Sequence, residues 1–234
     1  MQTIQSNRCR GFGILRRSFV FLMGVSAVFA LSSCAFLQPR ADPTRFYVLT
    51  VGQAVPAAVT EANVKRWRVG LRAVEVPAYL QTRFMVVRSG TNEIHFAEFD
   101  RWAEPLDRGI SRVLKDSLGS ARNVESVALD SHGEDTLDYE FKIRILACEG
   151  ARGETGADSL RFAMTWELRS LGTNSQVMKH GAFAASPATW DGNDHGRLAL
   201  GLSQAIAEAG QTLAADLPMS AMSADKASLE ATKP

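Results

Sequence analysis

The sequence predicts an α+β fold of two layers, in which two main amphipathic helices pack on a mostly antiparallel mixed sheet. Two observations lead to this prediction. Several segments alternate apolar and polar residues, as strands with one buried face do, and two others repeat apolar residues at helical spacing. With 234 residues, 46% of them hydrophobic and 22% charged, the chain can form the core of one ordinary domain.

Strands are expected to begin this domain, which we place at residues 45–217. Residues 46–49 are a short β-prone run. Residues 66–73 alternate apolar side chains with arginine and glycine, and Pro77 is expected to end or bend that strand at an edge of the sheet. Residues 52–63, between these two runs, are predicted to form a loop.

A hairpin and a helix are predicted next. The β-prone runs at 84–87 and 93–99 are joined by a short connection that contains Gly90, which is typical of a hairpin. Glu104 and Pro105 should open the helix, because proline is tolerated in the first helical turn. The apolar face of this helix consists of Leu106, Ile110, Val113, Leu114 and Leu118.

Further strands are predicted after this helix. Residues 124–129 suit a short strand. Residues 137–147 and 160–168 both alternate apolar and polar side chains, and together they predict a long antiparallel hairpin. A weaker strand is expected at 177–183.

The last predicted element of the domain is a long helix. Asp194 is expected to be its N-cap and Pro218 its stop. Residues 218–234 are small and polar without an apolar stripe, so they are predicted to be a disordered tail. The apolar stripe of the helix consists of Leu198, Leu202, Ala205, Ile206, Ala209, Leu213 and Leu217.

The first 33 residues are predicted to be an export signal. They contain four arginines and no acidic residue, and their apolar run at 19–31 is shorter than the roughly 20 residues that span a bilayer. A buried core helix is the alternative, which the flanking arginines disfavour. Arg16 and Arg17 resemble part of a twin-arginine signal, so the general secretory and twin-arginine export routes both stay open.

The apolar run leads into Leu31-Ser32-Ser33-Cys34, which resembles the lipobox of bacterial lipoproteins. This resemblance implies that Cys34 is acylated, becomes the mature amino terminus and anchors the chain in a membrane through its acyl chains. Ala35 occupies the position where an aspartate would favour the inner membrane, which indicates the outer membrane, facing the periplasm. Residues 34–44, which contain two prolines, are then a lipidated tether.

Charge and cysteine content limit the possible partners and bonds of the chain. The formal net charge is +1, and without the four arginines of the first 33 residues, 22 basic and 25 acidic residues leave −3. This balance excludes the strongly basic surface of a dedicated nucleic-acid binder. Cys148 is the only cysteine of the predicted domain, so no intramolecular disulfide is expected, and a shielded packing role is favoured over a reactive thiol.

No catalytic, cofactor or metal site is predicted. Signatures of phosphate loops, dinucleotide folds and serine hydrolases do not occur, and the four histidines lack metal-ligand spacing. The acidic segments at 130–138 and 191–194 lack the spacing of a calcium loop, so a solvated loop and a helix cap are expected. Tyr139, Phe162 and Trp166 are interpreted as core residues, with a lipid groove as the second interpretation.

Three segments carry a family resemblance. They are V-E-V-P-A-Y-L at 74–80, F-M-V-V-R-S-G-T-N-E-I at 84–94 and D-R-W-A-E-P-L at 100–106. In this order, and with R-F-Y-V-L after the lipobox, they resemble the ABC-type transport auxiliary lipoprotein family of the PqiC (YmbA) type. The resemblance covers nearly all of the mature domain, although the carboxyl-terminal half resembles the family only in its order of strands and helices.

The resemblance implies a non-enzymatic accessory subunit of an envelope transport system. Members of this type dock on an MCE-domain subunit of an ABC transport system, can form ring oligomers, and support the movement of lipids or hydrophobic compounds between the inner and outer membranes. The family has no catalytic residues to carry over, and no cofactor is expected. Arg101, Trp102, Glu104 and Pro105 are expected to be structural residues of a strand-to-helix corner, with an interaction surface as the second interpretation.

Two other classes of function stay open. An outer-membrane assembly or structural lipoprotein would share the anchor and the size of this chain. A lipoprotein hydrolase of the envelope is less favoured, because no nucleophile or acid–base pair stands out in the sequence. Association with an MCE subunit would separate the transport accessory from both alternatives.

Overall fold

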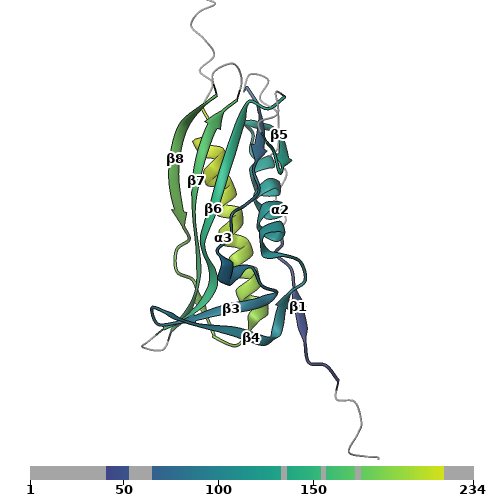
Figure 1. Ribbon diagram of the computed structural model, residues 1–234, viewed down its shortest axis with the longest axis vertical. Helices are drawn as coiled ribbons and strands as arrows, with labels where there is room; N and C mark the ends of the chain where they lie inside the picture. Colours follow the sequence, from purple (N-terminus) through teal and green to yellow (C-terminus); the bar gives the residue numbers. More distant parts are fainter. Residues whose placement is uncertain (1–40, 53–64, 133–135, 154–156, 172–174, 219–234) are drawn as a thin grey trace, which may run out of the picture. The chain divides into compact units, whose positions relative to one another are not determined.

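The computed structural model describes residues 41–52, 65–132, 136–153, 157–171 and 175–218. The predicted export signal, Cys34, most of the predicted tether, most of the loop predicted at 52–63 and the tail after Pro218 lie outside these residues. From Thr44 onward the described residues form one compact unit, shown in Figure 1. Within the described residues, no helix combines the length and the apolar character needed to cross a membrane.

The elements of this unit confirm the predicted α+β class. The helices are α2 (Leu106–Gly119), α3 (His195–Asp216) and the short 3-10 helix η2 (Ala78–Leu80). The strands are β1 (Arg45–Tyr47), β2 (Trp67–Leu71), β3 (Phe84–Ser89), β4 (Glu93–Trp102), β5 (Val124–Leu129), β6 (Tyr139–Arg152), β7 (Asp158–Ser170), β8 (Gln176–Ala184) and β9 (Thr189–Trp190).

Strand β6 is the centre of the mixed sheet. One of its edges forms a long antiparallel ladder with β7, which in turn pairs with β8 and β9. The other edge pairs in parallel with β2 near the start of β6 and with β3 near its end. Strand β5 adds to β2, while β4 and then β1 add to β3, so that β1, β5 and β8 each pair with one strand only among the described strands.

The connection from β2 to β3 follows the edge of β6. After β2 ends, Glu75 still exchanges backbone hydrogen bonds with Ile143 and Ile145, at 3.0 and 2.8 Å. The chain then turns at Pro77 into η2 before β3 begins. Strand β2 itself already ends at Leu71 and lies between β6 and β5, so Pro77 does not end it at an edge of the sheet as predicted. Neither η2 nor β9 was predicted, because each is too short to show a periodicity.

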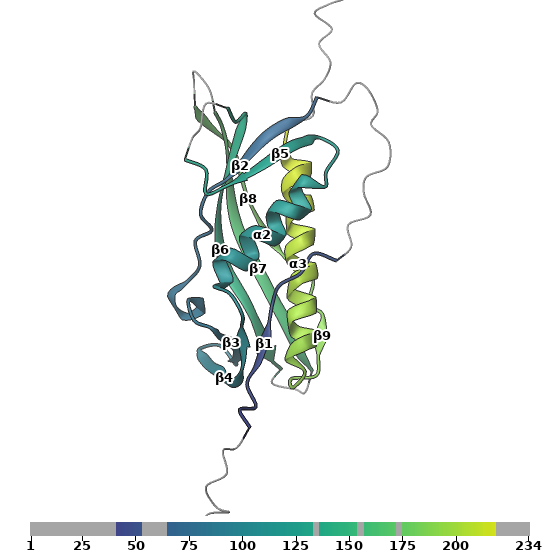
Figure 2. The ribbon, with the colours of Figure 1, turned by 90° about the vertical axis from the view of Figure 1, so that its right-hand side faces the viewer.

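Both helices lie on one face of the sheet, side by side, as Figure 2 shows. All residues of the predicted apolar faces are buried, which explains why each helix packs as it does. The helices approach closely where Gly210 of α3 faces Ser117 of α2. A side chain at position 210 would not fit there, because its Cβ would lie 2.7 Å from the Ser117 Cβ. Ser117 Oγ also donates a hydrogen bond to the Ala207 carbonyl.

The core between the two layers contains several residues that the sequence had left open. Phe162 and Trp166 are buried in it, which confirms their interpretation as core residues. Cys148 is buried as well, and burial raises the pKa of its thiol to about 12, so the thiol is a packing group rather than a nucleophile. Asp194 caps α3 by accepting a hydrogen bond from the Arg197 backbone at 3.0 Å, as predicted.

Candidate interaction site

Four of the five predicted site residues meet at one corner of the unit. Arg101 and Trp102 end β4, while Glu104 and Pro105 lead directly into α2. The backbone holds this corner from two sides, because Trp102 N–H donates to the Arg83 carbonyl at 2.6 Å and Ala103 N–H donates to the Tyr47 carbonyl at 2.8 Å. Cys34, the fifth residue, lies outside the described residues.

The side of the corner that faces the helices is a closed polar and aromatic cluster. Trp102 is 4% exposed and belongs to the same buried cluster as Leu106 and Ile110. Next to it, the buried Asp100 carboxylate accepts a hydrogen bond from the Tyr47 hydroxyl at 2.9 Å. Burial, and then the neighbouring Asp100 carboxylate, raise the pKa of the Tyr47 phenol, so the hydroxyl stays protonated and can donate.

Two further groups complete the surroundings of Asp100. The Arg45 guanidinium forms an ion pair with the Asp100 carboxylate at 2.9 Å. His195 Nδ1, at the start of α3, lies 3.2 Å from the other carboxylate oxygen, without the alignment of a hydrogen bond. Asp100 therefore connects β1, β4 and α3 at one point.

Glu104 and Pro105 fix the start of α2. Pro105 is the N-cap residue, and its carbonyl accepts from the backbone N–H groups of Arg108 and Gly109. The Glu104 carboxylate forms an ion pair with Arg112 two turns into the helix, and Arg112 also donates to the Leu49 carbonyl at 2.9 Å. Both residues therefore make their contacts within the unit, to α2 and to the segment after β1.

Arg101 points the other way, to the outer side of the sheet. In the sheet register, Phe46 and Phe84 flank Arg101 on its two neighbouring strands, so the three side chains share one face. The Arg101 guanidinium lies over the Phe84 ring, 5.1 Å from its centroid, and the Phe84 and Phe96 rings are 6.3 Å apart. We call Phe46, Phe84, Phe96 and Arg101 the aromatic patch.

The aromatic patch is open to solvent. Phe46 is 59% exposed and Phe96 is 51% exposed, and Phe99 nearby is also exposed. An irregularity in the pairing of β3 with β4 separates the Phe84–Arg101 pair from the Val86–Phe96 pair, which brings Phe96 and Arg101 to the same face despite their odd spacing. This patch was not predicted from the sequence. The spacing of three between Phe96 and Phe99, which breaks the alternation of a strand, was the available signal.

A pocket of about 430 Å³ lies on the other side of the corner, between η2 and the start of α2. Its apolar part consists of Val74, Val76, Leu80 and Leu106, and its polar part consists of Gln81, Thr82, Arg83 and Asp107, with Pro105 between them. The pocket has the size of a small-ligand site. No catalytic pair of side chains accompanies these residues in the pocket lining.

The candidate calcium loops have structural partners instead. Asp130 forms an ion pair with Arg108 at 2.6 Å. Asp191 accepts hydrogen bonds from the backbone N–H groups of Asn193 and Asp194, which lower the pKa of its carboxyl and shape the turn before α3. Among the described residues, His, Cys, Asp and Glu side chains do not gather in any group of three that could hold a metal ion.

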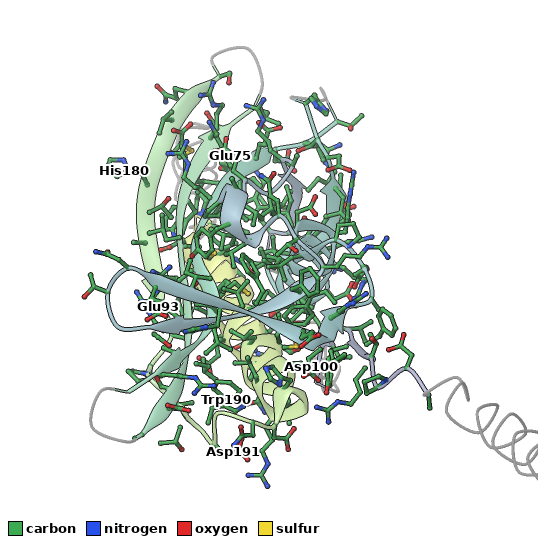
Figure 3. The ribbon with its side chains drawn as sticks, turned by 60° about the horizontal axis from the view of Figure 1, so that its bottom comes forward. Glu75, Glu93, Asp100, His180, Trp190 and Asp191 are labelled. Atoms are coloured by element: carbon green, nitrogen blue, oxygen red, sulfur yellow. The ribbon has the colours of Figure 1, made fainter. Side chains whose placement is uncertain are left out.

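Figure 3 shows the end of the unit that carries this corner. The β3–β4 hairpin crosses it, with Glu93 near the hairpin tip and Asp100 near the other end of β4. Trp190 and Asp191 lie on the same end, just before α3. The corner is thus built from the first strand, the hairpin and the start of the last helix, which are far apart in the sequence.

Comparison with known proteins places this architecture in a family. A protein of Xanthomonas campestris from the DUF330 family has a similar fold, with a TM-score of 0.60 and 14% sequence identity over 73% of this chain and 93% of its own. An uncharacterised protein gives a TM-score of 0.59 and 19% identity over 75% of this chain and 99% of its own. No curated protein matches the sequence significantly. The family model described as ABC-type transport auxiliary lipoprotein component matches residues 47–214, so the chain belongs to this family.

Proposed function

We propose that this protein is a membrane-anchored accessory lipoprotein that docks on the MCE-domain subunit of an ABC-type envelope transport system. In this role it supports the movement of lipids or other hydrophobic compounds between the inner and outer membranes. The observation that carries the proposal is the family match, which extends over residues 47–214. The protein acts through its surface and not through catalysis, because a transport accessory needs a partner and not a reaction.

The proposed anchor is the acylated Cys34, in the outer membrane and facing the periplasm. Four features of the sequence support it: the basic start, the short apolar run, the small residues before Cys34, and Ala35 after it. Several acyl chains on one cysteine are expected to hold the protein stably, since one chain alone binds only marginally.

The proposed docking uses the exposed parts of the unit. Strands β1, β5 and β8 each pair with only one of the strands that the structure describes, so each presents a second edge on which a partner strand or a second copy of the chain can pair. A stable complex of this kind buries at least about 1,000 Å². We therefore expect the protein to bind its MCE subunit, and to do so as a homo-oligomer.

Co-purification tests this proposal. The full chain, tagged at its carboxyl end, is extracted from membranes with detergent, and the MCE-domain protein of the same organism is sought in the eluate. We expect the two proteins to elute together and the free protein to exceed the mass of a monomer. Folded protein that never associates with the MCE subunit, or that hydrolyses an envelope lipid, would contradict the proposal.

A matched variant tests the anchor separately. Cys34→Ala is expected to release the protein from the membrane or to leave it as the unprocessed precursor, because it lacks the acylated sulfur. Cell fractionation with labelled fatty acid, such as palmitate, measures this. Unchanged attachment and mass in the variant would rule out the lipobox interpretation while leaving MCE docking open.

A further inference from the structure

We propose that the aromatic patch contacts the phospholipid surface of the membrane in which the protein is anchored. This proposal rests on one part of the proposed function, namely that the chain is anchored in a membrane through a residue that precedes Arg45. It goes beyond that function because it assigns a second, non-covalent attachment to the membrane. It also gives the aromatic patch a partner other than the MCE subunit.

The first observation is that the patch exposes apolar aromatic surface to water, which is energetically unfavourable. Phe46 is 59% exposed and Phe96 is 51% exposed. The Phe96 ring lies beside the partly buried Phe84, and Phe46 pairs with Arg101 on the neighbouring strand. Neighbouring exposed aromatic residues on a monomer usually mark a site that another surface covers. A bilayer interface suits them, because aromatic rings insert at the level of the lipid headgroups.

The second observation concerns charge. Arg101 forms no ion pair with any acidic side chain in the described part of the chain, and its buried Nε atom has no hydrogen-bond acceptor there. The acidic residues beside it are engaged elsewhere, Asp100 with Arg45 and Glu104 with Arg112; Glu98 is the exposed exception. A guanidinium that lies over an aromatic ring and forms no ion pair with the described acidic side chains is suited to a phosphate group.

The third observation is the length of chain between the proposed anchor and the patch. Cys34 and Arg45 are 11 residues apart, and such a segment spans at most about 40 Å when extended and about 20 Å on average when flexible. Strand β1, which carries Phe46, is the first element after this segment. A short tether keeps the patch at a millimolar effective concentration near the lipid surface, so a weak contact is enough.

The opposite end of the sheet provides a matched control. Val177 and Met178 at the start of β8 are 47% and 48% exposed, close to the values for Phe46 and Phe96. Strand β8 starts opposite Ser170, which pairs with the first residue of β6, whereas β3 pairs with the last three residues of β6. The two apolar sites therefore have similar exposure but lie at opposite ends of the longest strand.

The test places a fluorescent probe at each site. The chain from Ala35 onward is produced with a histidine tag in place of Cys34 and bound to vesicles of phosphatidylethanolamine, phosphatidylglycerol and a small fraction of nickel-chelating lipid. The tag supplies an anchor at the natural position, so the result does not depend on whether Cys34 is acylated. An environment-sensitive thiol probe is attached in Phe96→Cys or Val177→Cys, while the buried Cys148 stays unlabelled.

We expect the probe at position 96 to shift to the blue on vesicles and to be quenched by lipids that carry a nitroxide near the headgroup. The probe at position 177 should show neither effect. Arg101→Gln combined with Phe46→Ser should reduce the quenching at position 96 several-fold, whereas Val177→Ser with Met178→Ser should not change it. Circular dichroism confirms that each variant is folded.

Two results would overturn the proposal. In the first, the probe at position 96 stays as exposed to water on vesicles as it is in solution. In the second, it changes only when the MCE subunit is added, which would make the patch a protein interface and would support the proposed function. If the probe at position 96 contacts lipid but the protein does not co-purify with the MCE subunit, the proposed function alone is overturned.

Discussion

Arg101 and Trp102 are neighbours in the sequence, yet they belong to two regions that differ in almost every physical respect. On the inner side of β4, Trp102 and Asp100 are buried and in contact with groups from β1 and α3. On the outer side, Arg101 lies between the exposed Phe46 and the partly buried Phe84 and has no acidic partner among the described residues. Because side chains alternate along β4, its inner face stabilises the fold and its outer face is available for binding.

This difference explains how the motif R-W-A-E-P-L can have two roles at once. Trp102, Glu104 and Pro105 position the start of α2, and their contacts are internal. Arg101 contributes little to those contacts and is held in place by the Phe84 ring. Substitutions on the inner side should therefore reduce the free energy of unfolding, whereas substitutions on the outer side should change binding.

The largest expected effect is that of Trp102→Ala. Loss of a large buried aromatic side chain should lower the free energy of unfolding by about 3 to 5 kcal/mol. Urea denaturation followed by circular dichroism measures this. A near-normal unfolding midpoint together with lost partner binding would show that Trp102 serves binding rather than stability. The two sides of β4 would then not differ in role.

A smaller effect is expected for Asp100→Asn. The variant keeps an acceptor for the Tyr47 hydroxyl but loses the ion pair with Arg45, so the free energy of unfolding should fall by about 1 to 3 kcal/mol. Tyr47→Phe is the companion variant, and its effect should overlap with that of Asp100→Asn rather than add to it. Additive effects would show that Asp100 does not act through Tyr47.

A still smaller effect is expected for Asp138→Asn at the other end of β6. Hydrogen bonds from the Arg68 side chain, together with one from its backbone, hold the pKa of the Asp138 carboxyl below its usual range. The folded state therefore gains stability from ionised Asp138 above its unfolded pKa, near pH 4, and loses it as the pH falls through the lower folded pKa. Unfolding curves should separate wild type from variant at pH 7 and converge once the pH is below the folded pKa of Asp138; a constant difference would contradict this origin.

The smallest effect on stability is expected for Phe96→Ser on the outer side. The side chain is half exposed, so the free energy of unfolding should change by no more than about 0.5 kcal/mol. Val177→Ser is the matched control and should behave alike. A loss for Phe96→Ser as large as that for Trp102→Ala would mean that the patch is part of the core.

Most of the fold could be predicted from the sequence because its elements are long. The alternation through β6 and β7 and the apolar stripes of α2 and α3 extend over many residues, so each pattern is unambiguous. The order of the strands could not be predicted in the same way. Nothing in the alternation of β2 records that it lies between β6 and β5, since strand pairing is decided by the packing of the whole sheet.

The candidate site was only half predictable for a related reason. The burial of Trp102 follows from an apolar ring just before an amphipathic helix. The exposure of Phe46 and Phe96 does not, because an aromatic residue in a β-prone run is usually part of the core. Their exposure arises from the edge position of β1 and from the irregular pairing of β4, and both are properties of the assembled sheet.

The way β1 joins the fold also has a mechanical consequence. Any pull that a membrane exerts through the residues before Thr44 reaches the compact unit at β1, a strand of three residues at the edge of the sheet. Arg45 and Tyr47 are connected through Asp100 to β4 and α3. The Leu49 carbonyl is connected through Arg112 to α2. With the proposed anchor at Cys34, tension on this short strand would therefore be distributed over both layers of the unit, and β1 would not separate from β4 without breaking these contacts.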